Sequence, residues 1–274
     1  MNRPEDSLLG KSIKPAARYD PRLLFPIARA DQRIAIGVSR PLPFKGVDIW
    51  NVYELSWLDQ RGKPRVALGE IRIPADSPNL IESKSLKLYL NSFAQERLES
   101  AAALRFRMSA DLAGTAGAAV GVSLVEPHAF RSQRLAELEG DTIDALDLPI
   151  DDYGPPNPSH LSIAGTEVVE ECLVSHLFKS NCPVTGQPDW ASVQIRYAGQ
   201  RIDRIGLLRY LISFRDHAGF HEHCVERIFM DLSNRCRPSE LTVFGRYTRR
   251  GGIDINPWRS SGSEAAPNPR GARQ

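Results

Sequence analysis

The feature that most constrains the fold is an internal repeat. Residues 86–93 align with residues 207–214, 121 positions later, and five of the eight residues match. In the first copy the matching apolar residues are Leu86, Tyr89, Leu90 and Phe93, which follow the i, i+3, i+4, i+7 spacing of one helical face. The repeated unit is therefore predicted to contain a helix with a buried stripe.

A second match lies upstream of the first in each copy. Residues 62–72 align with residues 186–196 at an offset of 124, and five residues (Gly, Pro, Ala, Ile and Arg) are shared. Two matches in the same order, at nearly the same separation, indicate a tandem duplication. Each half of the chain is therefore expected to form the same structural unit.

The order of elements predicts the fold class. Each half begins with two strands and two helices and continues with further strands, which is typical of an α+β unit with helices on one face of an antiparallel sheet. The first half predicts strands at 49–57, 65–73 and 118–124, with helices at 83–93 and 96–110. The second predicts strands at 168–178, 191–197, 241–248 and 253–258, with helices at 203–214 and 220–232. We expect domains at 1–145 and 146–262, and a disordered tail at 263–274, which is rich in Pro, Gly, Ala and Arg.

Composition indicates a globular intracellular protein. The 274 residues are 42% hydrophobic and 25% charged, with a net charge of +2, so charge alone does not favour nucleic-acid or membrane binding. The N-terminal Met1 to Asp6 lacks the apolar core of a signal peptide, and no stretch reaches the roughly 18 apolar residues of a membrane helix. Four cysteines without a Cys-x-x-Cys pair are expected to be free thiols in a reducing cytoplasm.

The strongest local signal for chemistry is the segment from Ser180 to Asp189. Cys182 ends a predicted strand, and the following Gly-Gln-Pro predicts a tight turn that returns Asp189 close to it. A thiol is mostly protonated at pH 7, so a carboxylate that takes the proton and passes it to substrate would assist a cysteine nucleophile. A strand-end cysteine beside a turn aspartate is the alternative.

A second candidate opens the helix predicted at 220–232. Its apolar face places Cys224 in the core, while His221 and Glu222 lie in the first turn. A capping Glu222 is the simple interpretation. A metal cluster that includes His223 is disfavoured, because residues two apart on a helix face different ways.

A third candidate is the start of the first repeated helix. Ser83 is a plausible N-cap, and Lys84 would place a cation beside exposed N–H groups that can hold a phosphate. An ordinary capped helix is the alternative. In the second copy Asp203 and Ile205 replace Glu82 and Lys84, which favours a special role for the charged pair. The run from Gly114 to Gly121 does not fit a dinucleotide-binding fingerprint.

Together, residues 82–93, 180–189 and 220–222 resemble the NADPH-dependent 7-cyano-7-deazaguanine reductases, the nitrile reductases of queuosine biosynthesis, in their long two-module form. The resemblance covers about residues 20–260. It implies tandem tunnelling-fold modules that close into a barrel on oligomerisation, and reduction of a nitrile to a primary amine with two NADPH. It implies a deazaguanine substrate, no metal, and no direct contact with nucleic acid or membrane. Two modules per chain leave sheet edges with which another chain can pair, so a homodimer is expected.

The resemblance also implies roles for individual residues. Cys182 would form a thioimide with the nitrile carbon, Asp189 would supply a proton, and His221 would hold the intermediate and assist proton transfer. Substrate binding would involve Ile81, Glu82, Ser83, His221 and Glu222, and NADPH binding would involve Ser83, Lys84, Arg250 and Gly251. Carboxylates suit the N–H donors of a deazaguanine edge, and cations with backbone donors suit the NADPH phosphate.

Two alternatives remain open from the sequence. GTP cyclohydrolases use the same fold with a bound zinc, for which Cys182, His221 and Cys224 would be conceivable ligands. A tandem purine-binding module without catalysis would retain ligand binding in a Cys182→Ala variant and have no turnover to lose.

Overall fold

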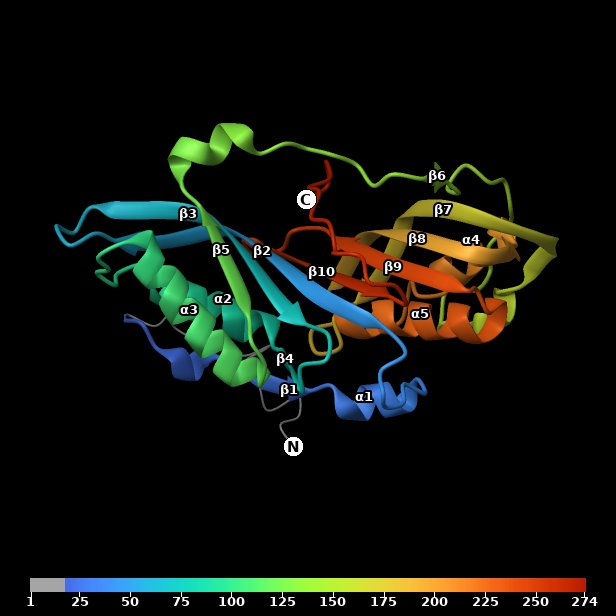
Figure 1. Cartoon of the computed structure of the whole chain (residues 1–274), viewed down its shortest axis with the longest axis horizontal. Helices are drawn as coiled ribbons and strands as arrows, with labels where there is room; N and C mark the ends of the chain where they lie inside the picture. Colours follow the sequence, from blue (N-terminus) through green and yellow to red (C-terminus); the bar gives the residue numbers. More distant parts are fainter. Residues whose placement is uncertain (1–17) are drawn as a thin grey trace. The chain divides into compact units, whose positions relative to one another are not determined.

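The computed structural model describes residues 18–274 and divides them into two compact units (Figure 1). Unit 1 contains residues 18–31, 48–134 and 249–255, and unit 2 contains residues 32–47, 135–248 and 256–274. This division differs from the predicted boundaries at 145 and 262. The segment at the start of β10 (Ile253–Ser260) belongs to unit 1 because Asp254 accepts hydrogen bonds from Asn51 and Tyr53. The predicted absence of a signal peptide concerns Met1 to Asp6, which lie outside the described residues.

Unit 1 places its two main helices beside a sheet with the order β5-β3-β2-β10, in which β2 and β10 also extend into unit 2. The packing of α3 against β5 helps to bury an apolar core that includes Trp50, Ile71, Tyr89 and Leu104. The elements are η2 (Pro21–Leu23), β1 (Pro26–Ala28), α1 (Ala30–Ala35, shared with unit 2), β2 (Lys45–Leu58), β3 (Pro64–Pro74), β4 (Asn79–Ile81), α2 (Ser83–Ser92), α3 (Ala101–Ala116), β5 (Gly121–Val125) and η3 (Pro127–Ser132).

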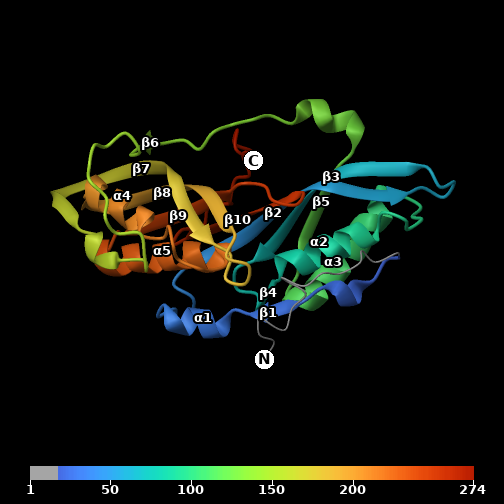
Figure 2. The ribbon, with the colours of Figure 1, turned by 180° about the vertical axis from the view of Figure 1, so that it is seen from behind.

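Unit 2 repeats this arrangement with the strand order β10-β9-β8-β7-β6 (Figure 2). The helices pack against strands, α4 on β7 and α5 on β9, above fully buried side chains such as Ile195, Leu207, Ile228 and Val243. The pairing is antiparallel except between β6 and β7. The elements are β6 (Asp141–Thr142), η4 (Pro158–His160), β7 (Ile163–Asn181), β8 (Pro188–Ile202), α4 (Arg204–Ile212), α5 (His221–Cys236), β9 (Glu240–Tyr247) and the remainder of β10.

A repeated hydrogen bond links the two helices of each unit. Tyr89 on α2 donates to Asp111 on α3 at 2.6 Å, and Tyr210 on α4 donates to Asp231 on α5 at 2.7 Å. Each aspartate lies ten residues after the first residue of its helix. Burial and the neighbouring carboxylate raise the pKa of both tyrosines, so each remains a neutral donor. The α+β class and the duplicated order of elements therefore agree with the prediction.

The second helix of unit 1 begins later than predicted. The sequence predicts a helix at 96–110, but α3 spans Ala101–Ala116. Ser100 determines its start by accepting a hydrogen bond from the Ala103 N–H at 3.1 Å. The helix ends at Gly117, whose φ of 73° lies in the left-handed region, which glycine adopts without steric cost.

The tail predicted to be disordered at 263–274 packs instead against unit 2. Gln274 is 7% exposed, and its Nε2 donates to the Tyr247 carbonyl at 3.0 Å. Arg246 donates from Nη1 to Asn268 Oδ1 at 2.7 Å. The prediction of disorder was based on amino-acid composition alone. Composition does not show that polar side chains of the tail form hydrogen bonds with particular groups on β9.

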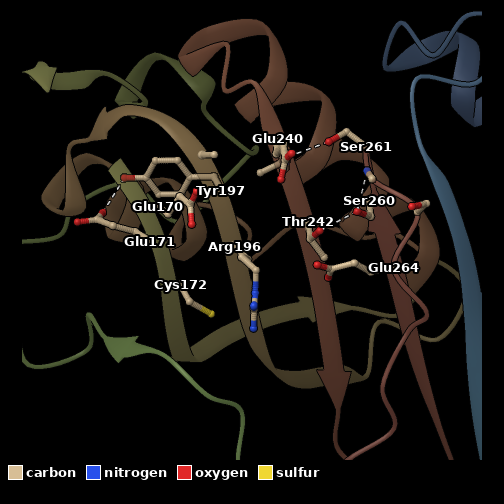
Figure 3. A pocket seen from close by; sticks show the side chains of 14 residues that line it. Glu170, Glu171, Cys172, Arg196, Tyr197, Glu240, Thr242, Ser260, Ser261 and Glu264 are labelled. Carbon is tan, nitrogen blue, oxygen red and sulfur yellow. Dashed lines mark hydrogen bonds between the residues drawn. The ribbon is translucent and has the colours of Figure 1, made fainter. Parts of the chain in front are cut away.

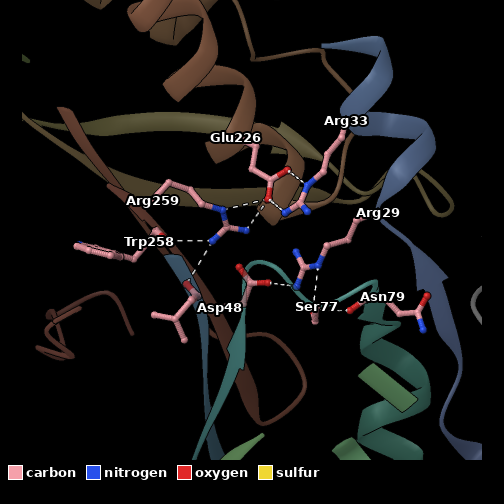
Figure 4. Close-up of polar contacts among 9 residues, drawn as sticks. Arg29, Arg33, Asp48, Ser77, Asn79, Glu226, Trp258 and Arg259 are labelled. Atoms are coloured by element: carbon pink, nitrogen blue, oxygen red, sulfur yellow. Dashed lines mark hydrogen bonds and ion pairs between the residues drawn. The ribbon is translucent and has the colours of Figure 1, made fainter. Parts of the chain in front are cut away.

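Buried arginines are neutralised inside each unit (Figure 4). In unit 1, Arg29 donates to Asp48 at 2.6 Å and to Ser77 at 3.2 Å. In unit 2, the fully buried Glu226 accepts hydrogen bonds from two guanidinium groups. The contacts come from Arg33 at 2.6 and 2.9 Å and from Arg259 at 2.8 and 3.0 Å.

Among the described residues, every helix is too short or too polar to span a bilayer.

Candidate functional site

The hairpin between β7 and β8 carries Cys182 and Asp189. Strand pairing sets Ser180 opposite Asp189 and continues to Cys182, whose N–H donates to the Gln187 carbonyl at 2.8 Å. The predicted turn is present, with Gly186 at φ 66°. Directly opposed residues of an antiparallel pair point to the same face, and so do residues two apart on one strand. Ser180, Cys182 and Asp189 therefore share one face of the hairpin.

The segment before α5 is bound to the same hairpin. The Asn181 N–H donates to the His217 carbonyl at 2.8 Å, and the Gly219 N–H donates to the Asn181 carbonyl at 3.0 Å. These bonds fix the first turn of α5 beside the end of β7. As a result, His221 Nε2 lies 3.4 Å from Asp189 Oδ2.

The side chains at this position are nearly enclosed. Cys182 and Asp189 are each 7% exposed, and Glu222, the second residue of α5, is 3% exposed. Glu222 lies in the first turn of α5, where the simple interpretation places it, although the N-cap residue itself is Phe220. A thiol, a carboxylate and an imidazole thus lie at one end of the unit 2 sheet, shielded from most water.

Tyr247 belongs to this cluster and was not found from the sequence. Its ring stacks on the His221 imidazole, with centroids 3.7 Å apart and an interplanar angle of 9°. Burial, followed by electrostatic interaction with Cys224 and Asp189, raises the pKa of Tyr247 well above its usual value. The only sequence signal is its place at the end of a predicted strand, which is shared by many residues without a function.

Cys224 is packed in the core, as its helical face predicts. It is 0% exposed, as are Ile228 and Leu232 one and two turns later. Burial raises the pKa of its thiol to about 12. Because the neutral thiol is favoured in the fold, Cys224 contributes to stability below its unfolded pKa, near 9, and loses that contribution as pH rises towards 12.

Cys224 is expected to resist alkylation in the native protein. At pH 8 a pKa of about 12 leaves roughly a thousandfold less thiolate than in the unfolded chain. Iodoacetamide followed by peptide mass mapping should show a reaction at Cys224 that is slower by at least this factor than in urea. Similar native and unfolded rates would contradict the assignment.

The start of α2 is capped by Glu82 and not by Ser83. The carboxylate accepts from the Lys84 N–H at 2.7 Å and from the Ser85 N–H at 2.8 Å. Asp203 caps α4 in the same way, with two bonds of 3.1 Å. The carboxylate therefore serves the shared helix in both units, and the comparison with Asp203 no longer favours a special role.

A glycine turn of unit 1 lies beside α2. A Cβ on Gly251 would approach the Lys87 side chain to 3.2 Å, and one on Gly252 would approach the Glu54 carboxylate to 2.6 Å. Both glycines have positive φ, 63° and 77°. Only glycine fits at these two positions, because a side chain would collide with Lys87 or Glu54. The backbone of Arg250 and Gly251 therefore lies near the face of α2 that carries Lys87. Cationic side chains and turn N–H groups of this kind suit a phosphate-bearing cofactor.

The equivalent hairpin of unit 1 lacks the chemical groups of unit 2. The Asp59 N–H donates to the Lys63 carbonyl at 2.9 Å and the Gly62 N–H donates to the Asp59 carbonyl at 2.9 Å, which matches the pattern around Cys182. By this correspondence Asp59 and Arg65 occupy the places of Cys182 and Asp189. They form an ion pair at 3.8 Å.

The helix that follows this hairpin, α3, also lacks the functional side chains of its counterpart α5. The first two residues of α3 are Ala101 and Ala102, where α5 has His221 and Glu222. The combination of a thiol, an imidazole and carboxylates is thus confined to the second copy of the repeat.

A cavity of about 520 Å³ lies elsewhere on the unit 2 sheet (Figure 3). Four of its lining residues form one row across the strands, namely Cys172, Arg196, Thr242 and Ser260. None of the site residues predicted from the sequence lines it. Burial raises the pKa of Cys172, whereas Arg196 acts to lower it.

Comparison with known proteins gives matches along most of the chain. Residues 16–124 match a family described as "Nitrile reductase, 7-cyano-7-deazaguanine-reductase N-term", and residues 188–266 match one described as "QueF-like protein". A protein of Bordetella avium named "NADPH-dependent 7-cyano-7-deazaguanine reductase" is 58% identical over 270 residues, which cover 98% of each chain. A protein of Burkholderia multivorans with the same name is 57% identical over 273 residues, covering 99% of each.

A solved structure titled as the archaeosine synthase QueF-Like in the apo form also matches, with a TM-score of 0.31 and 17% identity. The match covers 35% of this chain and 96% of that chain.

Proposed function

The chain belongs to the family of NADPH-dependent 7-cyano-7-deazaguanine reductases, and we propose that it reduces the nitrile of 7-cyano-7-deazaguanine to an aminomethyl group in queuosine biosynthesis. The observation that carries the proposed mechanism is the Asp189–His221 contact of 3.4 Å at the hairpin that bears Cys182. A nucleophile and two proton-transfer groups are the set that such a reduction requires.

In the proposed first step, Cys182 adds to the nitrile carbon. A C–S bond forms, one C–N π bond breaks, and the thiol proton passes through Asp189 to the nitrile nitrogen, which gives a thioimide. The nitrile carbon is a weak electrophile, so capture by a soft thiolate divides a difficult reduction into easier steps. The low exposure of Cys182 and Asp189, 7% each, would protect the thioimide from hydrolysis.

The following steps consume two hydrides and two protons. NADPH, held by Ser83, Lys84, Arg250 and Gly251, would supply both hydrides to the former nitrile carbon. After the first addition the C–S bond breaks, which returns the Cys182 thiolate and leaves an imine, and the second addition gives the amine. We assign the associated proton transfers to Asp189 and His221. Among residues 18–274 the buried Nδ1 of His221 has no hydrogen-bond partner, which leaves it available to the substrate.

Substrate recognition is assigned to carboxylates. The ring N–H and exocyclic NH₂ of a deazaguanine are donors, and Glu82 and Glu222 can accept from them. Each oxygen of Glu82 accepts one backbone N–H, and Oε1 also accepts from the Ser83 hydroxyl at 3.4 Å, so the further acceptor capacity is on Oε2. Ile81 and Ser83 flank Glu82 in sequence and are assigned to the same role, as is His221.

For NADPH we assign Ser83 and Lys84 at the start of α2, with Arg250 and Gly251 in the glycine turn. The close approach of Gly251 to Lys87 supports this assignment, because it brings the turn to the same helix. Lys84 lies one turn before Lys87 and so on the same face of α2. A phosphate could there meet cations and backbone N–H groups together.

Substitution of Glu222 should weaken substrate binding. In Glu222→Leu a donor pair of the ring loses its acceptor, so we expect KM to rise at least tenfold, while Glu222→Gln, which keeps one acceptor oxygen, should show a smaller rise. Steady-state kinetics and calorimetry with 7-cyano-7-deazaguanine measure this effect. An unchanged affinity in both variants would mean that the ring edge is recognised elsewhere.

We also propose that the two units are tunnelling-fold modules and that the protein is a homodimer. Each unit combines a sheet with two helices on one side, which supports tunnelling-fold modules, and sheet edges such as β5 suit pairing with a second chain in a homodimeric barrel. Light scattering would test the dimer. Four free cysteines support a reducing cytoplasmic location.

The stoichiometry of the reaction tests the function. We expect two NADPH to be oxidised for each aminomethyl product, measured by absorbance at 340 nm and by mass spectrometry, with activity unaffected by a chelator. Ring opening of GTP that stops on addition of a chelator would favour the cyclohydrolase alternative. Ligand binding without turnover would favour a binding module.

A further inference from the structure

Tyr247 restricts the orientation of the His221 ring. The two rings are nearly parallel, with centroids 3.7 Å apart. Tyr247 is 1% exposed, so its ring is a fixed surface and not a mobile surface side chain. Rotation of the imidazole about Cβ–Cγ must pass through an orientation perpendicular to Tyr247, which the stacked ring obstructs. Stacking therefore hinders exchange between the two parallel orientations of the imidazole, and the one that is present directs Nε2 towards Asp189.

Tyr247 is itself held by two primary amides. Its N–H donates to Asn256 Oδ1 at 3.2 Å, and its carbonyl accepts from Gln274 Nε2 at 3.0 Å. The same Gln274 nitrogen donates to Asn256 Oδ1 at 2.8 Å. Asn256 is 0% exposed and Gln274 is 7% exposed. Both backbone polar groups of Tyr247 are therefore fixed by side chains that are far from it in sequence.

Strand pairing aligns Tyr247 with the residues around Asp189. Tyr247 is opposite Ala191 in the β8–β9 register, and the Thr248 N–H donates to the Trp190 carbonyl at 2.8 Å. A shift of Tyr247 would therefore also disturb the strand that carries Asp189.

We propose that Tyr247 is a positioning residue for His221, and that the amide pair Asn256–Gln274 is its anchor. The chemical consequence rests on the proposed function, in which His221 transfers protons. Tyr247 does not take part in bond making. It fixes the imidazole plane so that Nε2 remains directed towards Asp189 and Nδ1 towards the reacting nitrogen.

The test compares Tyr247→Leu with Tyr247→Phe. Phenylalanine keeps the stacked face and leucine removes it. We expect kcat to fall about 10- to 100-fold in Tyr247→Leu with KM within threefold of wild type, and to stay within threefold of wild type in Tyr247→Phe. A wild-type kcat in the leucine variant, or an equal loss in both variants, would overturn the proposal.

A second measurement does not depend on catalysis. A ring stacked at this distance shifts the imidazole proton resonances of His221 upfield, and NMR of histidine-labelled protein should show this shift in wild type and Tyr247→Phe but not in Tyr247→Leu. Absence of the shift in wild type would refute the stacking. Failure of the proposed function would appear separately, as a wild-type protein that binds no nitrile and oxidises no NADPH.

Gln274→Ala provides a variant that leaves both rings intact and tests the anchor. We expect kcat to fall about 3- to 10-fold with a broadened His221 signal, while Arg273→Ala, which removes the neighbouring side chain, should behave as wild type. A Gln274→Ala protein with wild-type kcat and an unchanged His221 spectrum would remove the amide pair from the proposal.

Discussion

Replacement of Cys182 by alanine is expected to lower kcat/KM for nitrile reduction at least a thousandfold and to abolish covalent attachment of the substrate. Without the thiol no C–S bond can form, and hydride addition to an unactivated nitrile is slow. Intact-mass spectrometry after mixing with 7-cyano-7-deazaguanine alone should show one adduct on the wild-type chain. Calorimetry should show that the alanine variant still binds the substrate.

The matched control is Cys172→Ala, which lies on β7 ten residues before Cys182. Cys172 lines the separate cavity of unit 2, so its loss should leave adduct and turnover unchanged. Persistence of the adduct in Cys182→Ala, or turnover near wild type, would show that sulfur 182 is not the nucleophile.

The largest effect on stability is expected for Glu226→Gln. The carboxylate is fully buried and binds the guanidinium groups of Arg33 and Arg259, so its neutralisation removes a buried negative charge that both cations share. Breaking such a buried pair costs about 3–5 kcal/mol. For a domain of this size we expect Tm to fall by roughly 10 °C in a thermal unfolding scan.

The control for this prediction is Glu240→Gln on the exposed start of β9, which should change the free energy of unfolding by less than about 0.5 kcal/mol. Equal melting temperatures of Glu226→Gln and wild type would contradict the assigned role. Joint replacement of Glu226, Arg33 and Arg259 by apolar residues of similar volume should recover much of the loss, because all three charges of this cluster are then removed together.

Local periodicity explains which parts of the fold could be predicted. The i, i+3, i+4, i+7 stripe from Leu86 to Phe93 identifies α2, and its copy identifies α4, because a helix is determined by residues close in sequence. The hairpin around Gly186 was predictable for the same reason. The short β1 and β4 were missed, since three-residue strands have too few positions to show alternation.

The features that could not be predicted depend on contacts between residues that are far apart in the sequence. Arg33 and Glu226 are 193 positions apart, and Tyr247 and Gln274 are 27 apart, so no local pattern links them. The candidate site was predictable where its residues share a motif, as in the hairpin that bears Cys182 and Asp189. Tyr247 was not predictable, because its role depends on which strand lies beside the start of α5.

The alanines at the start of α3 have a consequence for the evolution of this chain. Under the proposed function, positions 182, 189, 221 and 222 of the second copy are constrained by chemistry as well as by packing, whereas the matching positions 59, 65, 101 and 102 of the first copy lack the chemical constraint. Gene duplication thus gave one copy freedom to drift at these four places. Among relatives, substitutions should accumulate faster there than at 182, 189, 221 and 222, even though both sets occupy matching points of the same architecture.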